Sequence, residues 1–194
     1  IQKPYEDGWE DYMKDINNRW THGEFIYKDS IEFPDSLKYQ TKVFKKTVYG
    51  GGGIMPDDFI PIDTTLRSQY HQMLLRKGIL FSFISKYVDA NRSYLYKEYP
   101  DFETFEKNFK INDDIINELN KMAIDEKIYI DSLDNPTELN NNYLNNHIKA
   151  LVDSDLWDKS EFWKVFNNYN PNYQRAYEII KDDKKYNLLI KGRD

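Results

Sequence analysis

The strongest constraint on the fold is a set of helix-start signals in the last two thirds of the chain. Asn135-Pro136-Thr137-Glu138 places Asn at the N-cap, Pro at the first helical position and Glu at N3, and Asn170-Pro171 repeats the first two features. Asp158-Lys159-Ser160-Glu161 has the same spacing between a capping side chain and Glu. Apolar residues at helical spacing follow each start. The sequence therefore predicts an all-helical region from about residue 66 onward.

Apolar residues in this region fall on one face of each predicted helix. They are Ile115, Ile116, Leu119, Met122 and Ala123; Leu144, Ile148, Leu151 and Val152; Phe162, Val165, Phe166 and Tyr169; and Tyr173, Ala176, Tyr177 and Ile180. We expect the core to contain Leu119, Leu151, Phe166 and Tyr177. An earlier helical stretch runs from Leu66 to Arg92, where Gly78 predicts a break or kink.

The first third of the chain has a different pattern. Apolar residues at helical spacing between Trp9 and Trp20 predict a short amphipathic helix that ends before Gly23. The β-branched and aromatic segments 41–49 and 58–62 predict two short strands.

Four consecutive glycines, Gly50 to Gly53, separate these two predicted strands, and Pro61 predicts that the second strand lies at a sheet edge or ends there. A phosphate-binding loop would need a helix start and a Lys-Ser/Thr pair after the glycines, but Ile54-Met55-Pro56-Asp57 follows. The run is better explained as a tight connection where a neighbouring backbone leaves no room for a Cβ.

Composition excludes several classes of function. Lys and Arg number 27 against 33 Asp and Glu, so the net charge of −6 disfavours nucleic acid as a partner. The absence of Cys excludes disulfides, thiolate zinc sites and Cys nucleophiles. The longest apolar stretch, residues 79–84, is far shorter than the roughly 20 residues of a membrane span.

The residues by themselves do not form a complete active site. His22, His71 and His147 are widely spaced, and His147 lies on an apolar helical face, where a histidine at the edge of the core is expected. Three Ser and Lys pairs have a spacing of four that is typical of solvated helix faces and lacks a Ser-x-x-Lys motif. They are Ser82 with Lys86, Ser93 with Lys97 and Ser160 with Lys164.

His22-Gly23-Glu24 and the acids Asp57, Asp58 and Asp63 carry side chains of the kinds that bind metal ions. These positions match neither a His-Glu-x-x-His motif nor a calcium loop. No metal and no cofactor is therefore predicted.

One motif goes beyond composition. Residues 48–57, Val-Tyr-Gly-Gly-Gly-Gly-Ile-Met-Pro-Asp, resemble the Gly-Gly-Gly-Gly-Ile-x-Pro-Asp signature of the C-terminal processing peptidases, also called tail-specific proteases. Ile1-Gln2-Lys3-Pro4-Tyr5 resembles the segment after a Gly-Arg-Ser turn in the catalytic domain of bacterial members. Asp63-Thr64-Thr65, Lys77-Gly78-Ile79 and residues 87–92 are similar to a helical extension that some members carry.

The resemblance implies a parent protein that is an exported bacterial serine endopeptidase of the periplasm or cell envelope. In that family a Ser nucleophile and a Lys base precede the glycine motif, in a catalytic core that follows a PDZ domain. This chain would then be the C-terminal portion, without a catalytic residue of its own, acting on protein or peptide substrates only through the parent. The motif residues carry over as a conformational feature: Gly50, Gly51, Gly52, Gly53, Ile54, Pro56 and Asp57.

The resemblance also implies an α+β fold class: a strand-containing remnant of an α/β peptidase catalytic domain over residues 1–65, followed by an all-helical C-terminal domain over residues 66–194. The orphan strands lead us to expect that the isolated chain pairs with another copy as a homo-oligomer. Two alternatives stay open. One is a stand-alone helical protein-binding module without catalysis, and the other is a nucleotide-binding protein that uses the glycine run.

Overall fold

The computed structural model describes residues 8–50, 54–129 and 135–191. It is mostly helical with a small two-stranded antiparallel sheet, so the α+β class is confirmed at this coarse level. The chain divides into two compact units. The helical unit comprises Thr64–Gln174, and the ribbon unit comprises the residues up to Asp63 together with those from Arg175 onward. Within the described ranges, no helix combines the length and hydrophobicity that a bilayer crossing requires.

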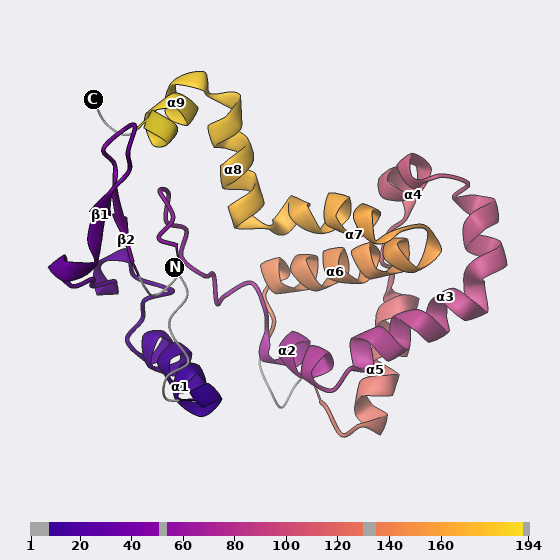
Figure 1. Cartoon of the computed structure of the whole chain (residues 1–194). Helices are drawn as coiled ribbons and strands as arrows, with labels where there is room; N and C mark the ends of the chain where they lie inside the picture. Colours follow the sequence, from indigo (N-terminus) through magenta and orange to yellow (C-terminus); the bar gives the residue numbers. More distant parts are fainter. Residues whose placement is uncertain (1–7, 51–53, 130–134, 192–194) are drawn as a thin grey trace. The chain divides into compact units, whose positions relative to one another are not determined.

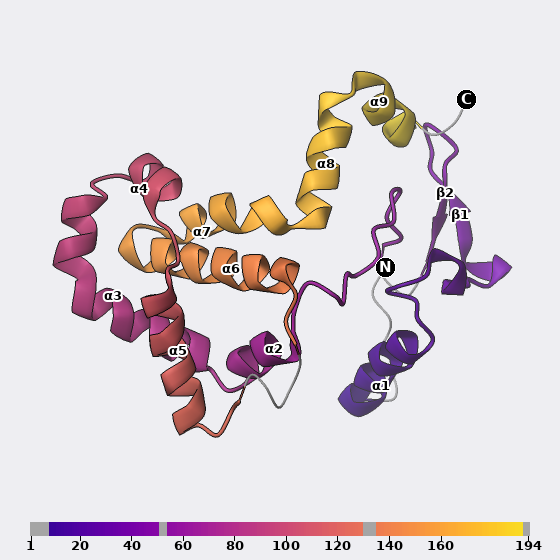
Figure 2. The same ribbon diagram turned by 180° about the vertical axis from the view of Figure 1, so that it is seen from behind.

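The helical unit consists of successive helices, as expected beyond residue 66, and includes a short helix, α4, that the sequence did not predict (Figure 1). Its elements are α2 (Gln69–Arg76), α3 (Ile79–Glu98), α4 (Phe102–Asn108), α5 (Asp113–Asp125), α6 (Glu138–Leu156), α7 (Lys159–Phe166) and the 3₁₀ turn η4 (Asn167–Tyr169). Helix α8 (Pro171–Lys181) continues from this unit into the ribbon unit, where α9 (Asp183–Lys191) follows. Figures 1 and 2 show α7 running alongside α6 in both views.

The predicted break at Gly78 is confirmed. Gly78 has a φ of 69°, in the left-handed region that favours glycine, and it separates α2 from α3. Two of the predicted helix starts are confirmed as well. The carboxylate of Asp158 accepts a bond from the backbone N–H of Ser160 at 2.8 Å, and Asn170 Oδ1 accepts from the N–H of Asn172 at 3.1 Å.

The start predicted at Asn135 is wrong by two residues. Helix α6 begins at Glu138, and its N-cap is Thr137, whose hydroxyl accepts from the N–H of Asn140 at 3.3 Å. In return the side-chain oxygen of Asn140 accepts from the N–H of Thr137 at 2.9 Å. This reciprocal capping box satisfies two helix-end donors together, which explains why Thr137 takes the N-cap in place of Asn135.

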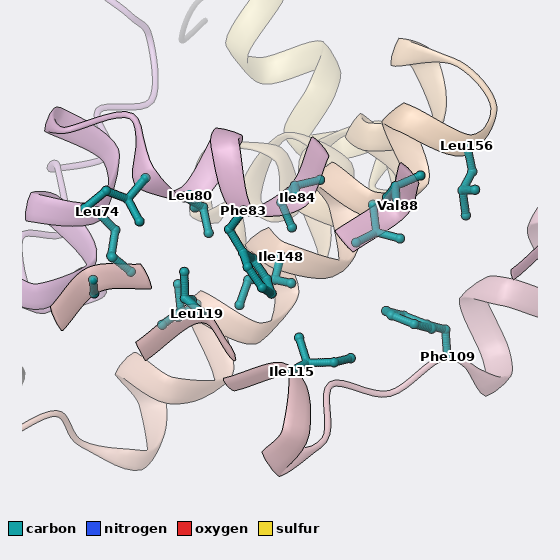
Figure 3. Packing of buried hydrophobic residues seen from close by; sticks show 14 of the residues in the cluster. Leu74, Leu80, Phe83, Ile84, Val88, Phe109, Ile115, Leu119, Ile148 and Leu156 are labelled. Atoms are coloured by element: carbon teal, nitrogen blue, oxygen red, sulfur yellow. The ribbon is translucent and has the colours of Figure 1, made fainter. Parts of the chain in front are cut away.

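The core of the helical unit is formed by α2, α3, α5 and α6. Figure 3 shows side chains from these helices meeting in one cluster, with Phe83, Leu119 and Ile148 near its centre. The rings of Phe105 and Phe109 stack at 4.5 Å and extend the cluster. Its fully buried aliphatic members are Leu74, Leu80, Val88, Leu95, Leu119, Ile148 and Val152.

The predicted core is correct for Leu119, which is fully buried, while Leu151 and Phe166 are half-buried. It is wrong for Tyr177, whose side chain is 47% exposed. No residue of α8 is buried, because the core of the helical unit is already closed by the helices that precede α8. The apolar stripe of α8 therefore lies on an exposed face.

The ribbon unit contains α1 (Gly8–Thr21), the 3₁₀ turns η1 (Lys28–Ser30) and η2 (Asp35–Leu37), and the strands β1 (Lys38–Gln40) and β2 (Thr47–Tyr49). The strands pair antiparallel with Tyr39 opposite Val48. Helix α1 confirms the predicted helix before Gly23, but none of its residues is buried.

The strand prediction for segment 41–49 is wrong in extent, since only its last three residues form β2. A turn precedes them, in which the N–H of Thr41 donates to the carbonyl of Lys46 at 2.9 Å and Lys45 has a φ of 52°. The predicted strand over 58–62 is wrong too. Pro61 has no N–H to donate, and the ladder is reduced to one bond from the N–H of Ile62 to the carbonyl of Phe25.

Replacing Leu119 by Ala is expected to lower the free energy of unfolding of the helical unit by about 2–5 kcal/mol, because a fully buried leucine leaves a cavity. Urea denaturation followed by far-ultraviolet circular dichroism measures this loss. The matched control is Leu139→Ala, on an exposed part of α6, with an expected change within about 0.5 kcal/mol. Equal losses in both variants would contradict the core described above.

Candidate functional site

The glycine motif begins where the ribbon ends. The N–H of Gly50 donates to the carbonyl of Leu37 at 2.8 Å, and a Cβ on Gly50 would lie 2.9 Å from Cε2 of Tyr39. The expected close approach therefore exists at Gly50, but the neighbour is an aromatic ring rather than a backbone. Gly51 to Gly53 lie outside the described residues, as do Ile1 to Tyr5 of the family resemblance.

The last residue of the motif, Asp57, and the residue after it, Asp58, are held by basic side chains. The ammonium group of Lys46 forms an ion pair with Asp57 and also donates to the carbonyl of Leu189 at 2.8 Å. The carboxylate of Asp58 accepts from Nε of Arg175 at 2.6 Å. These contacts connect the end of the motif to the ribbon turn and to the C-terminal helices of the same unit.

Three of the four candidate carboxylates therefore pair with basic side chains. Besides Asp57 and Asp58, Glu24 accepts from Nε of Arg19 at 2.7 Å. In the part of the chain that the structure describes, no three His, Asp or Glu side chains come together as a metal site would require.

An apolar cavity of about 210 Å³ lies beside the motif in the ribbon unit. Its walls include the motif residues Ile54 and Pro56, and the half-buried ion pair of Arg19 and Glu24 forms part of its lining. The other lining residues are Phe25, Ile31, Phe33, Met55, Phe59, Ile60 and Ile62. The lining offers apolar surface and one charged pair, and it contains no nucleophile. It suits the packing of an apolar group better than bond-breaking chemistry.

The three Ser and Lys pairs do not form catalytic dyads. Lys164 lies 2.6 Å from the carboxylate of Glu161, and this contact raises the pKa of Lys164, which opposes the neutral form that a Lys base needs. Ser82 and Lys86 line an open surface hollow together with acidic Asp125 and Glu126. Ser93 and Lys97 both lie on the exposed part of α3.

Sequence reasoning missed a pair of histidines. His71 of α2 and His147 of α6 are both buried, and Nε2 of His71 lies 3.0 Å from Nδ1 of His147. One of these nitrogens carries the shared proton and the other accepts it. The two residues are 76 positions apart, and the only signal in the sequence was the apolar helical face that each one occupies. The prediction of a core-edge histidine at His147 is confirmed.

Burial lowers the pKa of both imidazoles, to about 3 for His71 and about 4 for His147. Burial is the largest cause of both shifts. His147 and then Arg67 contribute to the lowered pKa of His71, and Arg67 contributes to that of His147. Nδ1 of His71 has no hydrogen-bond partner among the described residues. The pair is therefore neutral at pH 7 and serves as a polar contact inside the core.

Comparison with known protein families shows a similarity in the helical unit. Residues 70–158 match the model of a family of unknown function, DUF8443. The match spans α2 to α6, which supply most of the helical core, and it does not include the glycine motif. No curated protein and no solved structure matches the chain.

Replacing Gly50 by Val is expected to destabilise the ribbon by roughly 1 kcal/mol, because the added Cβ meets the ring of Tyr39. Tyr39→Ala removes the obstacle, so Gly50→Val should cost clearly less in that background. Hydrogen exchange of the β1 and β2 amides measures both costs. A penalty of the same size with and without the Tyr39 ring would refute this explanation.

Replacing His71 by Gln is expected to make the melting temperature of the helical unit depend less on pH in the acid range. The folded-state pKa values of the pair lie below 6.5, so the neutral pair supports the fold above about pH 6.5, and this support is lost as pH falls towards 4 and 3. The difference in melting temperature between His71→Gln and the unsubstituted chain should change over that window. His22→Gln, at an exposed position, is the control and should follow the unsubstituted chain at every pH.

Proposed function

We propose that this chain is the C-terminal part of an exported Ser/Lys endopeptidase of the C-terminal processing type, which hydrolyses peptide bonds in protein substrates. The observation that carries the proposal is the likeness of residues 48–57 to the glycine signature of that family. In this proposal the Ser nucleophile and the neutral Lys that accepts its proton precede the chain, and backbone N–H groups stabilise the oxyanion.

The surroundings of the motif support a conformational role for this segment. Asp57 and Asp58 are occupied by ion pairs with Lys46 and Arg175, and the cavity beside the motif is apolar. A segment whose conformation is fixed by such ion pairs can support a catalytic domain without taking part in the reaction.

The exposed apolar surface of the ribbon unit supports the proposal from a different direction. Helix α1 exposes four large apolar side chains, Trp9, Met13, Ile16 and Trp20. Two further side chains of this unit, Val43 and Ile54, are each more than three quarters exposed. A two-stranded ribbon is marginally stable alone, and large exposed apolar patches mark interaction surfaces. We infer that this surface packs against the remainder of a catalytic domain and that the isolated chain covers it by self-association.

The partners that follow from the proposal are the remainder of the catalytic domain, an upstream PDZ domain and the substrate polypeptide. The compartment is the periplasm or the cell envelope. The chain itself acts as a structural or regulatory element.

A second candidate is a helical protein-binding module without catalysis. It is favoured by the closed core of the helical unit and by the family match, which covers that unit alone. The two candidates differ in the protein encoded by the whole reading frame. The first requires peptidase activity in that protein, and the second requires its absence.

The isolated chain is expected to leave an unfolded protein substrate intact, while the protein made from the whole reading frame cleaves it. Release of peptides from a fluorescent casein measures both activities. In the whole protein, Ser82→Ala, Ser93→Ala and Ser160→Ala should each keep full activity, because the proposed Ser nucleophile precedes the chain. A whole protein that does not cleave, or one inactivated by any of these three changes, would contradict the proposal.

Gly51→Val and Gly52→Val in the protein made from the whole reading frame should lower its melting temperature and its peptidase turnover together.

A further inference from the structure

Helix α6 carries a second buried ionisable residue, Asp153. The side chain is 0% exposed, and neither carboxyl oxygen has a hydrogen-bond partner among the described residues. Charged groups from three helices face it. They are Glu161 and Lys164 of α7, Lys149 of α6 itself and Glu106 of α4.

The two lysines near Asp153 are directed to other groups. The ammonium of Lys164 lies 2.6 Å from Glu161 and 4.8 Å from the ring centroid of Phe102. Lys149 donates to the backbone carbonyl of Glu106. An ionised carboxylate at position 153 would therefore be buried without a hydrogen-bond donor and would face the like charge of Glu161, and both effects are costly.

We propose that Asp153 makes the packing of α7 on α6 sensitive to protons: α7 is held while the carboxyl is neutral and is loosened when the carboxyl ionises. The position of the residue supports this directly. Asp153 lies on the part of α6 that faces α7, where α7 begins with Asp158 at its N-cap and continues with Glu161 and Lys164. Because α7 supplies Glu161 and Lys164, which face Asp153, a displacement of α7 would admit water to the charge.

The electrostatic surroundings put this response in the neutral range. Burial raises the pKa of Asp153 from 3.8 to about 7, Glu161 and Glu106 raise it, and Lys164 and Lys149 lower it. Because the folded-state pKa exceeds the unfolded value, the packing is strongest in acid and weakens as pH rises from about 4 to about 7. The buried histidine pair has the opposite dependence. The two groups on α6 therefore favour a mildly acidic optimum.

Helix α7 is followed by η4 and then by α8, the helix that continues into the ribbon unit. The inference goes beyond the proposed function and does not depend on it. Loss of peptidase activity would leave it standing, and its own failure would leave the peptidase proposal intact.

Hydrogen exchange of the full 194-residue chain, corrected for the intrinsic pH dependence of exchange, tests the proposal. Protection of the α7 amides should fall about tenfold between pH 6 and pH 8, which corresponds to a carboxyl with a pKa near 7. In the Asp153→Asn variant, the protection of the α7 amides should stay constant across this pH range. Asp155→Asn, two residues away on the same helix and paired with Arg92 at 2.8 Å, is the matched control and should respond as the unsubstituted chain does.

A titration of the Asp153 carboxyl carbon by nuclear magnetic resonance in the unsubstituted chain keeps the test decisive if Asp153→Asn folds poorly. A midpoint near 7, together with loss of α7 protection over the same range, supports the proposal. A midpoint near 3.8, or an α7 response in Asp153→Asn equal to that of the unsubstituted chain, overturns it.

Discussion

Burial of helix α6 is the constraint on which the helical unit depends. The helix packs against α3 on one side and α7 on another, and Ile148 and Val152 are fully buried within it. The same burial encloses two polar residues, His147 and Asp153, which lose their contact with water. A buried polar group must find a partner or become neutral. His147 meets this requirement by pairing with His71. Neither carboxyl oxygen of Asp153 has a hydrogen-bond partner among the described residues, and burial raises the pKa of this carboxyl.

The ribbon unit is organised by a different kind of interaction. No residue of its helix α1 is buried, and its two strands have three residues each. Ion pairs of Lys46 with Asp57 and of Arg175 with Asp58 connect segments that are distant in the sequence. Partly exposed ion pairs contribute little to stability. The interactions within the ribbon unit therefore stabilise it much less than the apolar core stabilises the helical unit. That contrast agrees with our proposal that the ribbon unit packs on a larger peptidase domain.

Local rules predicted the helical unit well where one residue decided the outcome. Gly78 ends α2 because glycine tolerates the left-handed backbone, and Asp158 caps α7 because its carboxylate reaches the first free N–H groups. The same rules failed where two residues competed, as when Thr137 and Asn140 formed a capping box and displaced Asn135. They failed again at Tyr177, since an apolar stripe shows only that a face can be buried.

The sequence by itself determined the mostly helical character beyond residue 66, the starts of α7 and α8, the break at Gly78 and the motif that suggests a peptidase. These features depend on neighbours within about one helical turn or on a continuous stretch of residues. Only the tertiary structure decided which polar residues meet. His71 and His147 are separated by 76 positions, and Asp58 and Arg175 by 117. Their contacts, and the burial that keeps Asp153 from water, arise from packing between helices, which no local spacing in the sequence encodes.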